Sequence, residues 1–385
     1  MIYLDNCATT PLDPAVADEM ARVSCECFGN PSSIHHAGRC ALRALSEARE
    51  KIAATILARA DEIVFTSSGT EANNFVISAV AQQPDAQGGT VHIVTSAVEH
   101  ASVANRLTYE ARNNPRTMEV AVTGVDQQGK LHFDELQAAI RPGTRLLTLL
   151  HCNNETGALL DLDRIFALKR EHPRMLLHLD IVQSYLKHPF DMRSMPADYL
   201  TVSAHKICGP KGIGFVYIRE GAPASPLLVG GAQERHRRAG TENVAAAAGF
   251  ARAADLMPAA RELRAHFIAL ERAFFGALDD EGARCWINGP PDHTRRQPGI
   301  FNLSFPGLRN KEDLVIACDL GGVMLSSTSA CHSGIVTDSH VLRAMGLPDE
   351  RRTGAVRLCF NKFQTEDEIR EGATIIARLA RRMAT

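Results

Sequence analysis

Three polar side chains, Asn153, Asp180 and Lys206, stand at or just beyond the ends of apolar runs that have the composition of buried strands. The three runs are residues 145–150, 176–180 and 199–203. They are spaced by about one strand–helix unit, so strands of one parallel sheet would bring all three groups to the same edge. A carboxylate and an amine are costly to desolvate there unless they serve a ligand. The alternative is three unrelated surface groups at the starts of loops.

A small turn that contains glycine opens a helix further upstream. Residues 67–74, Ser-Ser-Gly-Thr-Glu-Ala-Asn-Asn, follow an apolar run at 62–66. Free N–H groups at a helix N-terminus, together with Ser and Thr hydroxyls, can hold a phosphate. Ordinary helix capping is the alternative. The turn has neither the G-x-x-x-x-G-K spacing of a Walker motif nor a Rossmann G-x-G-x-x-G.

Together these groups suit pyridoxal 5'-phosphate better than other cofactors. That cofactor needs a lysine for a Schiff base, an acid beside its pyridine nitrogen and a phosphate anchor. Lys206, Asp180 and the turn at 67–74 supply these three types of group. His100 is placed to stack on one face of the ring and Val182 to pack on the other, although a lone histidine is more often structural.

The elements that must position these groups alternate between apolar strands and amphipathic helices. Further strands are expected at 62–66, 91–95 and 214–218, and helices at 40–57 and 133–140. This alternation predicts an α/β fold with a mainly parallel sheet.

The pattern changes after about residue 250, where a smaller α+β lobe is expected. We expect one long helix at 251–278, a turn at 288–291, a strand near 301–305, and helices at 311–319 and 365–382.

Composition narrows the classes of function. The 385 residues suggest about two or three domains, or one large domain with a smaller lobe. A net charge of −2 and an aromatic content of 5% speak against a nucleic-acid partner. No apolar run is long enough to cross a membrane, and the N-terminus lacks a secretion signal. The ten cysteines are irregularly spaced without C-x-x-C, so we expect a cytoplasmic protein with reduced thiols and no metal site.

Eight short motifs occur in order along the chain, at residues 3–11, 29–33, 66–74, 98–100, 153–157, 203–206, 209–212 and 238–243. Together they resemble the pyridoxal-phosphate-dependent cysteine desulfurases of the NifS/IscS type, in the class V aminotransferase superfamily, over essentially the whole chain. The resemblance implies the type I fold of PLP-dependent transferases. Its large domain, residues 12–250, would hold a mainly parallel seven-stranded sheet. Residues 1–11 and 251–385 would form a small α+β domain that carries the catalytic cysteine loop.

The resemblance also implies how the cofactor is held. Lys206 would form the Schiff base, Asp180 would pair with the pyridine nitrogen, and Gln183 would pair with the ring hydroxyl. His100 would stack on the ring and act as an acid or base. The phosphate would be held by Thr70, Ser203 and His205, and by Thr241 acting on the neighbouring subunit's cofactor. A homodimer follows from that last role.

The same resemblance implies the substrate and the nucleophile. Asn153 and Arg357 would bind the carboxylate of L-cysteine, for which a planar guanidinium is suited. Cys331 lies in the small, polar stretch 326–334, unlike Cys318 among apolar neighbours, so we expect it to be exposed and reactive. Cys331 would take the substrate sulfur as a persulfide, release L-alanine and pass the sulfur to an acceptor protein. The pathway would be iron–sulfur cluster assembly or sulfur modification.

Other functions remain open at this point. The Ala-Cys-His-Ser sequence around His332 is similar to that of selenocysteine lyases. A catalytically idle sulfur carrier or scaffold could keep the fold, but intact Lys206, Asp180 and Cys331 speak against it. A plain aminotransferase would have no use for Cys331. Three further cysteines have no assigned role: Cys7, Cys152 and Cys359.

Overall fold

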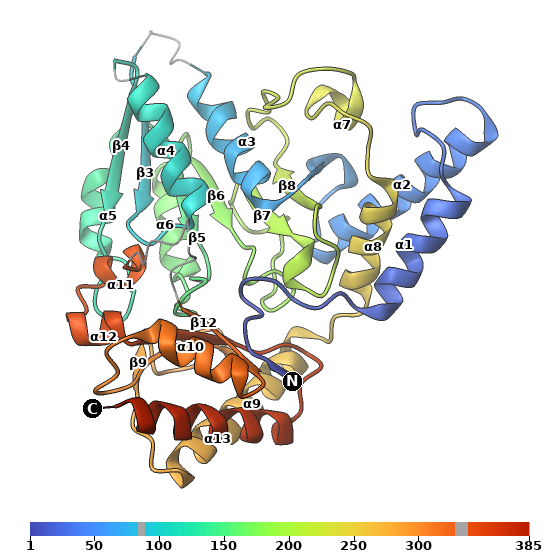
Figure 1. Ribbon diagram of the computed structural model, residues 1–385. Helices are drawn as coiled ribbons and strands as arrows, with labels where there is room; N and C mark the ends of the chain where they lie inside the picture. Colours follow the sequence, from blue (N-terminus) through green and yellow to red (C-terminus); the bar gives the residue numbers. More distant parts are fainter. Residues whose placement is uncertain (84–88, 115, 328–337, 385) are drawn as a thin grey trace.

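The computed structural model describes residues 1–83, 89–114, 116–327 and 338–384, and it has two lobes (Figure 1). The large lobe surrounds a seven-stranded sheet in the order β2-β8-β7-β6-β5-β3-β4. Its strands are β2 (Ile63–Thr66), β3 (Val91–Ser96), β4 (Met118–Thr123), β5 (Thr144–Leu150), β6 (Leu176–Asp180), β7 (Tyr199–Ser203) and β8 (Gly214–Ile218). Only β8 runs against its neighbours, which confirms the predicted mainly parallel sheet.

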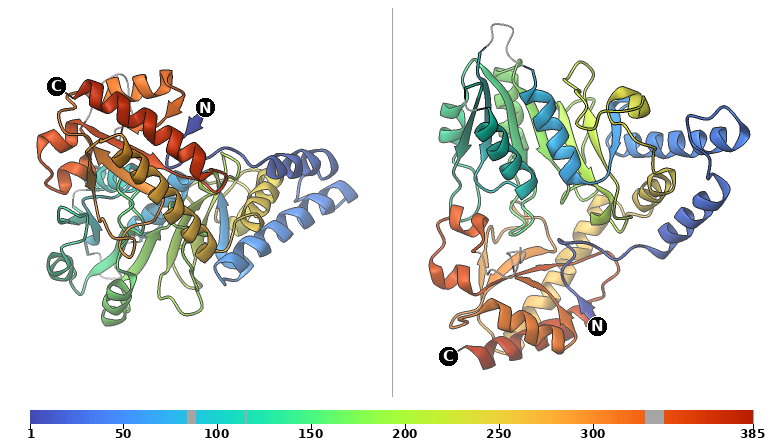
Figure 2. Two further views of the ribbon diagram at one scale, coloured as in Figure 1. Left: turned by 90° about the horizontal axis from the view of Figure 1, so that it is seen from below. Right: turned by 45° about the horizontal axis from the view of Figure 1, so that its top comes forward.

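Helices cover both faces of this sheet (Figures 1 and 2). They are α1 (Pro14–Glu26), α2 (His36–Thr55), α3 (Gly69–Ala81), α4 (Ala101–Asn113), α5 (Phe133–Ala139), α6 (Leu162–Glu171), α7 (Gln233–His236) and α8 (Val244–Asp255). Side chains alternate across each strand, so Ile63 and Phe65 enter one core while Val64 enters the other. Helices α3 and α4 close the core that contains Val64, and α2, α5, α6 and α8 contribute to the larger one.

The small lobe contains both chain ends (Figure 1). It has a four-stranded antiparallel sheet, β12-β13-β10-β9, and a parallel pair, β1-β11. These strands are β1 (Ile2–Tyr3), β9 (Trp286–Asn288), β10 (Ile300–Ser304), β11 (Val323–Met324), β12 (Ser326–Ser327) and β13 (Ala355–Cys359). Its helices are α9 (Ala260–Asp280), α10 (Lys311–Leu320), α11 (His340–Ala344), α12 (Asp349–Thr353) and α13 (Glu366–Met383). Ile2 and Leu4 pack in the core of the small lobe, so the N-terminal residues belong to it. The exact domain boundaries stay a prediction.

The expectation of one helix over 251–278 is wrong. The chain forms α8 to Asp255 and restarts as α9 at Ala260. Pro258 lies in the break: it lacks a backbone N–H and disfavours a helical conformation in the residue before it. The other expected strands and helices form within a few residues of their predicted bounds.

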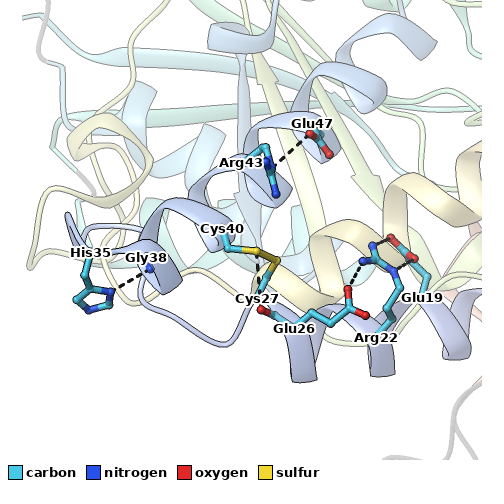
Figure 3. Close-up of a disulfide and its surroundings, with 9 residues drawn as sticks. All are labelled: Glu19, Arg22, Glu26, Cys27, His35, Gly38, Cys40, Arg43 and Glu47. Atoms are coloured by element: carbon cyan, nitrogen blue, oxygen red, sulfur yellow. Dashed lines mark hydrogen bonds and ion pairs between the residues drawn. A yellow bond between two sulfur atoms is a disulfide. The ribbon is translucent and has the colours of Figure 1, made fainter.

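The expectation of reduced thiols is wrong at one pair of cysteines. Cys27, at the end of α1, forms a disulfide with Cys40, near the start of α2, and their Cα atoms are 5.2 Å apart (Figure 3). Beside it, His35 caps α2, because its Nδ1 accepts a hydrogen bond from the Gly38 N–H at 3.2 Å. The disulfide therefore closes the loop between the two helices.

Two features are missing from the residues that the structure describes. None of the helices there combines the length and apolar character that crossing a bilayer requires. No three His, Cys, Asp or Glu side chains in the same ranges are grouped so as to hold a metal ion.

Candidate active site

Three neighbouring strands end at the candidate site. Asp180, the last residue of β6, is in register with Leu150 of β5 and Thr201 of β7. The loop containing Asn153 follows β5, and Lys206 ends a short 3₁₀ helix (Ala204–Lys206) that follows β7. The side chains at these strand ends therefore gather at one edge of the sheet, as their spacing predicts.

The Lys206 side chain is anchored by the N-terminal segment. Its Nζ donates hydrogen bonds to the carbonyl oxygens of Cys7 and Ala8, the latter at 2.7 Å. Burial lowers the pKa of Lys206 to about 8, and the nearby charge of Arg357 adds to the effect. With this pKa, about a tenth of the amine is neutral and nucleophilic at pH 7 and about half of it at pH 8.

Asp180 is buried and hydrogen-bonded at both carboxylate oxygens. Oδ2 accepts from Asn73 Nδ2 at 2.8 Å, and Oδ1 accepts from the Val182 N–H at 3.0 Å. The same Asn73 amide nitrogen also donates to Ser102 Oγ at 2.8 Å, and that hydroxyl lies 2.7 Å from His100 Nδ1. A continuous chain of hydrogen bonds thus links His100 to Asp180.

His100 begins helix α4. Its Nδ1 accepts from the Ser102 N–H at 3.2 Å, which caps the helix. Burial lowers the pKa of His100 and Lys206 adds to this, while Asp180 opposes it. The imidazole is therefore mostly neutral at neutral pH, a form that can both accept and donate a proton.

The N-terminus of α3 lies against the same strand ends. Ser68 caps this helix by accepting from the Glu71 N–H at 3.1 Å. A Cβ at Gly69 would lie 3.0 Å from Val182 Cγ2 and 3.6 Å from Ser203 Cβ. Because residue 69 has no side chain, the backbone at this helix end can lie close against Val182 and Ser203. Thr70, the next residue, is exposed.

The remaining predicted cofactor residues lie in different settings. Gln183 is buried, its Nε2 donates to the Cys7 carbonyl at 3.0 Å, and its Oε1 has no partner in the described part of the chain. His205 Nδ1 lies 3.1 Å from Thr9 Oγ1, and burial lowers the pKa of this imidazole to about 4. Thr241 is apart from Lys206 and lines a separate cavity of about 220 Å³ with Ser67.

Arg357, on β13, brings a buried cation to the site. Its Nη2 lies 2.7 Å from Asp5 Oδ1, and its Nη1 donates to the Asn154 carbonyl at 3.3 Å. Its Nε has no partner among the described residues. Asn153 differs, because its amide is used within its own loop: Oδ1 accepts from the Glu155 and Thr156 N–H groups, and Nδ2 donates to the Val98 carbonyl.

Cys331 lies outside the described residues, but the chain on both sides of it is fixed at the site. Ser326 of β12 is in register with Arg357 of β13. On the other side, Ser339 Oγ donates to Glu155 Oε2 at 2.5 Å, and His340 Nε2 lies 2.9 Å from the Glu99 carbonyl.

Three buried cysteines pack together beside this region, namely Cys7, Cys152 and Cys359. Burial would raise the pKa of Cys7, but a hydrogen bond with Cys359 and the charge of Arg357 outweigh burial and lower it. The pKa of Cys359 is raised, chiefly by burial. All three thiols are enclosed, so their contribution here is packing around Arg357 and the Cys7 carbonyl.

Comparison with known proteins identifies the family. The model of the family described as "Aminotransferase class-V" matches residues 2–371. The chain belongs to this family. It is 38% identical over 384 residues to the putative cysteine desulfurase IscS 1 of Bacillus subtilis (strain 168), covering 99% of each. Membership confirms the predicted family, type I fold and cofactor, pyridoxal 5'-phosphate.

Solved structures of family members have the same architecture. A NifS-like protein superposes with a TM-score of 0.89 at 32% identity, covering 98% of each chain. SspA in complex with cysteine superposes with a TM-score of 0.81 at 29% identity, covering 95% of this chain and all of that one.

Sequence reasoning missed several residues that organise the site. Asn73 and Ser102 connect Asp180 with His100, and Asp5 pairs with Arg357. Asn73 and Asp5 belong to motifs that carry the family resemblance, but their spacing alone gave them no partner. The contact between residues 5 and 357 joins the two ends of the chain within the small lobe, a pairing that no local pattern shows.

Proposed function

We propose that this protein is a pyridoxal-phosphate-dependent cysteine desulfurase that converts L-cysteine to L-alanine and takes up the sulfur as a persulfide on Cys331. The activity class follows from full-length similarity to cysteine desulfurases. One observation supports the proposal most strongly: three groups lie together at one edge of the sheet. They are the partly neutral amine of Lys206, the Asp180 carboxylate with two hydrogen bonds, and the His100 imidazole linked to that carboxylate.

The residues present fit the cofactor. Asp180 would face the pyridine nitrogen, while the free N–H groups of α3, with Thr70, Ser203 and His205, would hold the phosphate. The missing side chain at Gly69 lets this helix end lie close to Val182 and Ser203, and the unpartnered Gln183 Oε1 offers a free polar atom for the ring substituents. When bound, the cofactor supplies an electron sink that makes the α-proton of an amino acid acidic.

Proton movement falls to Lys206 and His100. The lowered pKa of Lys206 lets Nζ accept the α-proton of the substrate near neutral pH and return it to the product. His100, mostly neutral, can exchange a proton with the substrate thiol. Its Nδ1 is held by Ser102, which leaves Nε2 for this exchange.

Arg357 would bind the substrate carboxylate. Its unpartnered Nε and the second hydrogen of Nη2 form the edge of a guanidinium that suits a carboxylate with two hydrogen bonds. Asp5 and the Asn154 carbonyl fix the plane of this group. Asn153 would contribute through the shape of its loop, since its amide is already engaged.

Cys331 would perform the sulfur transfer. Cys331 is five positions after Ser326, a length of chain that spans at most roughly 18 Å, so its sulfur is within reach of the Arg357 region. The Cys331 thiolate forms a bond to the substrate sulfur as the carbon–sulfur bond breaks. The electron pair of that bond remains on the carbon, which takes up a proton to give alanine.

We further propose a homodimer in which Thr241 contacts the neighbouring subunit's cofactor, and a separate protein as sulfur acceptor.

We place the protein in the cytoplasm. The disulfide between Cys27 and Cys40 is unusual for this compartment, because cytoplasmic thiol pools usually keep such pairs reduced. The redox state of this pair in cells is therefore the direct check on that placement.

The test is incubation of the purified enzyme with L-cysteine, followed by mass spectrometry of the peptide that contains Cys331. We expect one extra sulfur on that peptide and release of alanine. Cys331→Ala should keep the cofactor absorbance but lose the persulfide and sulfur transfer. Cys25→Ala, which removes an exposed free thiol elsewhere, is the matched control and should behave as the parent. Undiminished desulfuration by Cys331→Ala would refute the proposal.

A further inference from the structure

A second cavity, of about 300 Å³, is lined in part by the loop after β5 that contains Asn153, and its lining does not include Lys206, Asp180 or His100. Its walls come from four parts of the chain: the end of β3 with Val98, residues 128–133, the region from the end of β5 to the first turns of α6, and residues 290–295 of the small lobe. We propose that this cavity binds a small anionic molecule with an apolar body, such as an aryl or alkyl phosphate or carboxylate.

One part of the cavity wall is apolar. Its lining includes the side chains of Leu131, Phe133, Leu149, Leu150, Leu160 and Ile165. Its volume is at the lower end of the range for small-molecule sites, and it is too small for a helix of a partner protein. The apolar lining therefore suits a body the size of one aromatic ring or a short alkyl chain.

The charged groups of the lining are mostly cationic. Lys130, Arg164 and Arg295 contribute three cations, against one carboxylate on Asp161. That carboxylate caps helix α6 by accepting from the Arg164 N–H at 3.2 Å. Within the described ranges, none of the three cations forms an ion pair with a carboxylate. An anion is the ligand that this imbalance favours.

Two of the cations are held in place. The Arg164 guanidinium carbon lies 3.7 Å from the centre of the Phe133 ring, over which it stacks. Arg295 Nη2 donates to Gln128 Oε1 at 2.7 Å. Neither contact neutralises the charge, so both guanidinium groups keep N–H donors for a ligand at little cost in side-chain entropy.

The loop that contains Asn153 forms part of the cavity lining. Asn153 and Val98 both line it, and the Asn153 amide donates to the Val98 carbonyl at 3.1 Å. A ligand here would thus contact the layer that positions His100 as well as residues of both lobes.

Calorimetric titration of the cofactor-loaded enzyme with phenyl phosphate tests the proposal, because the bound cofactor occupies the phosphate site next to Lys206. We expect saturable binding of phenyl phosphate at about 1 mM or tighter, and much weaker binding of inorganic phosphate, which lacks the apolar body. Arg164→Ala should weaken binding by about fivefold or more. Arg170→Ala, an exposed cation on the same helix, is the matched control and should leave affinity unchanged.

A second variant tests the location directly. Leu160→Trp should fill the cavity and abolish binding while the cofactor absorbance is retained. Absence of saturable binding, equal losses in Arg164→Ala and Arg170→Ala, or unchanged affinity in Leu160→Trp would each overturn the proposal. The desulfurase proposal does not depend on any of these outcomes.

Discussion

At the residue scale, a single side chain, Asn73, connects the two groups that would contact the cofactor ring. Its amide nitrogen donates to Asp180 and to Ser102, which in turn holds His100. A hydrogen bond to a charged group contributes about 1.5–3 kcal/mol when its partner is buried. Asn73→Ala should therefore weaken cofactor binding by about tenfold or more, measured by absorbance titration of the apoprotein. Asn113→Ala, an exposed asparagine at the end of α4, is the control, and equal affinities in the two variants would contradict the assignment.

The protonation of Lys206 is a second prediction at this scale. Burial lowers its pKa from 10.5 to about 8, because the cation loses water without gaining a carboxylate. The neutral amine captures the cofactor, so the rate of cofactor uptake by the apoprotein should rise with pH and level off above about 8. Stopped-flow absorbance measures this rate, with Lys211→Ala as control. A rate that keeps rising to pH 10.5 would mean an unperturbed lysine.

At the scale of elements, the sequence was most informative where strands end on polar residues. Asp180 and Lys206 could be placed at one edge because parallel strands with helical crossovers leave no other arrangement. The sequence was least informative at Pro258. The amphipathic pattern continues through this position, but proline interrupts the helical backbone there. The cysteine pair could not be predicted, because nothing in the spacing of Cys27 and Cys40 shows that α1 and α2 approach each other.

The disulfide between Cys27 and Cys40 leads to a prediction about thiol reactivity and thermal stability. Denatured protein without reductant should show eight reactive thiols of its ten cysteines, and all ten after reduction. Closing a loop of this length stabilises by about 3 kcal/mol in the chain-entropy view, so Cys40→Ser should lower the melting temperature. Cys25→Ser leaves the disulfide intact and should melt as the parent does. Ten reactive thiols without reductant would show that the pair is not oxidised in the purified protein.

At the scale of the whole molecule, the site depends on contacts between lobes that no local pattern encodes. Arg357 of the small lobe donates to the Asn154 carbonyl of the large lobe, and Ser339 donates to Glu155 of the large lobe. The family resemblance implied roles for Arg357 and Cys331. Only the structure shows that the chain on both sides of Cys331 is attached at the site.

The contact between Ser339 and Glu155 is the simplest of these attachments to remove. Burial raises the pKa of Glu155, so its hydrogen bond with Ser339 is the main compensation for placing this carboxyl in the interior. Glu155→Ala should release the chain that follows Cys331 from the large lobe and slow persulfide formation by about fivefold, with the cofactor absorbance unchanged. Single-turnover mass spectrometry of the Cys331 peptide measures this rate. Asp338→Asn is the matched control, because Asp338 pairs with Arg352 and Arg343 inside the small lobe and should leave the rate intact. Equal rates in Glu155→Ala and the parent would show that this attachment does not position Cys331.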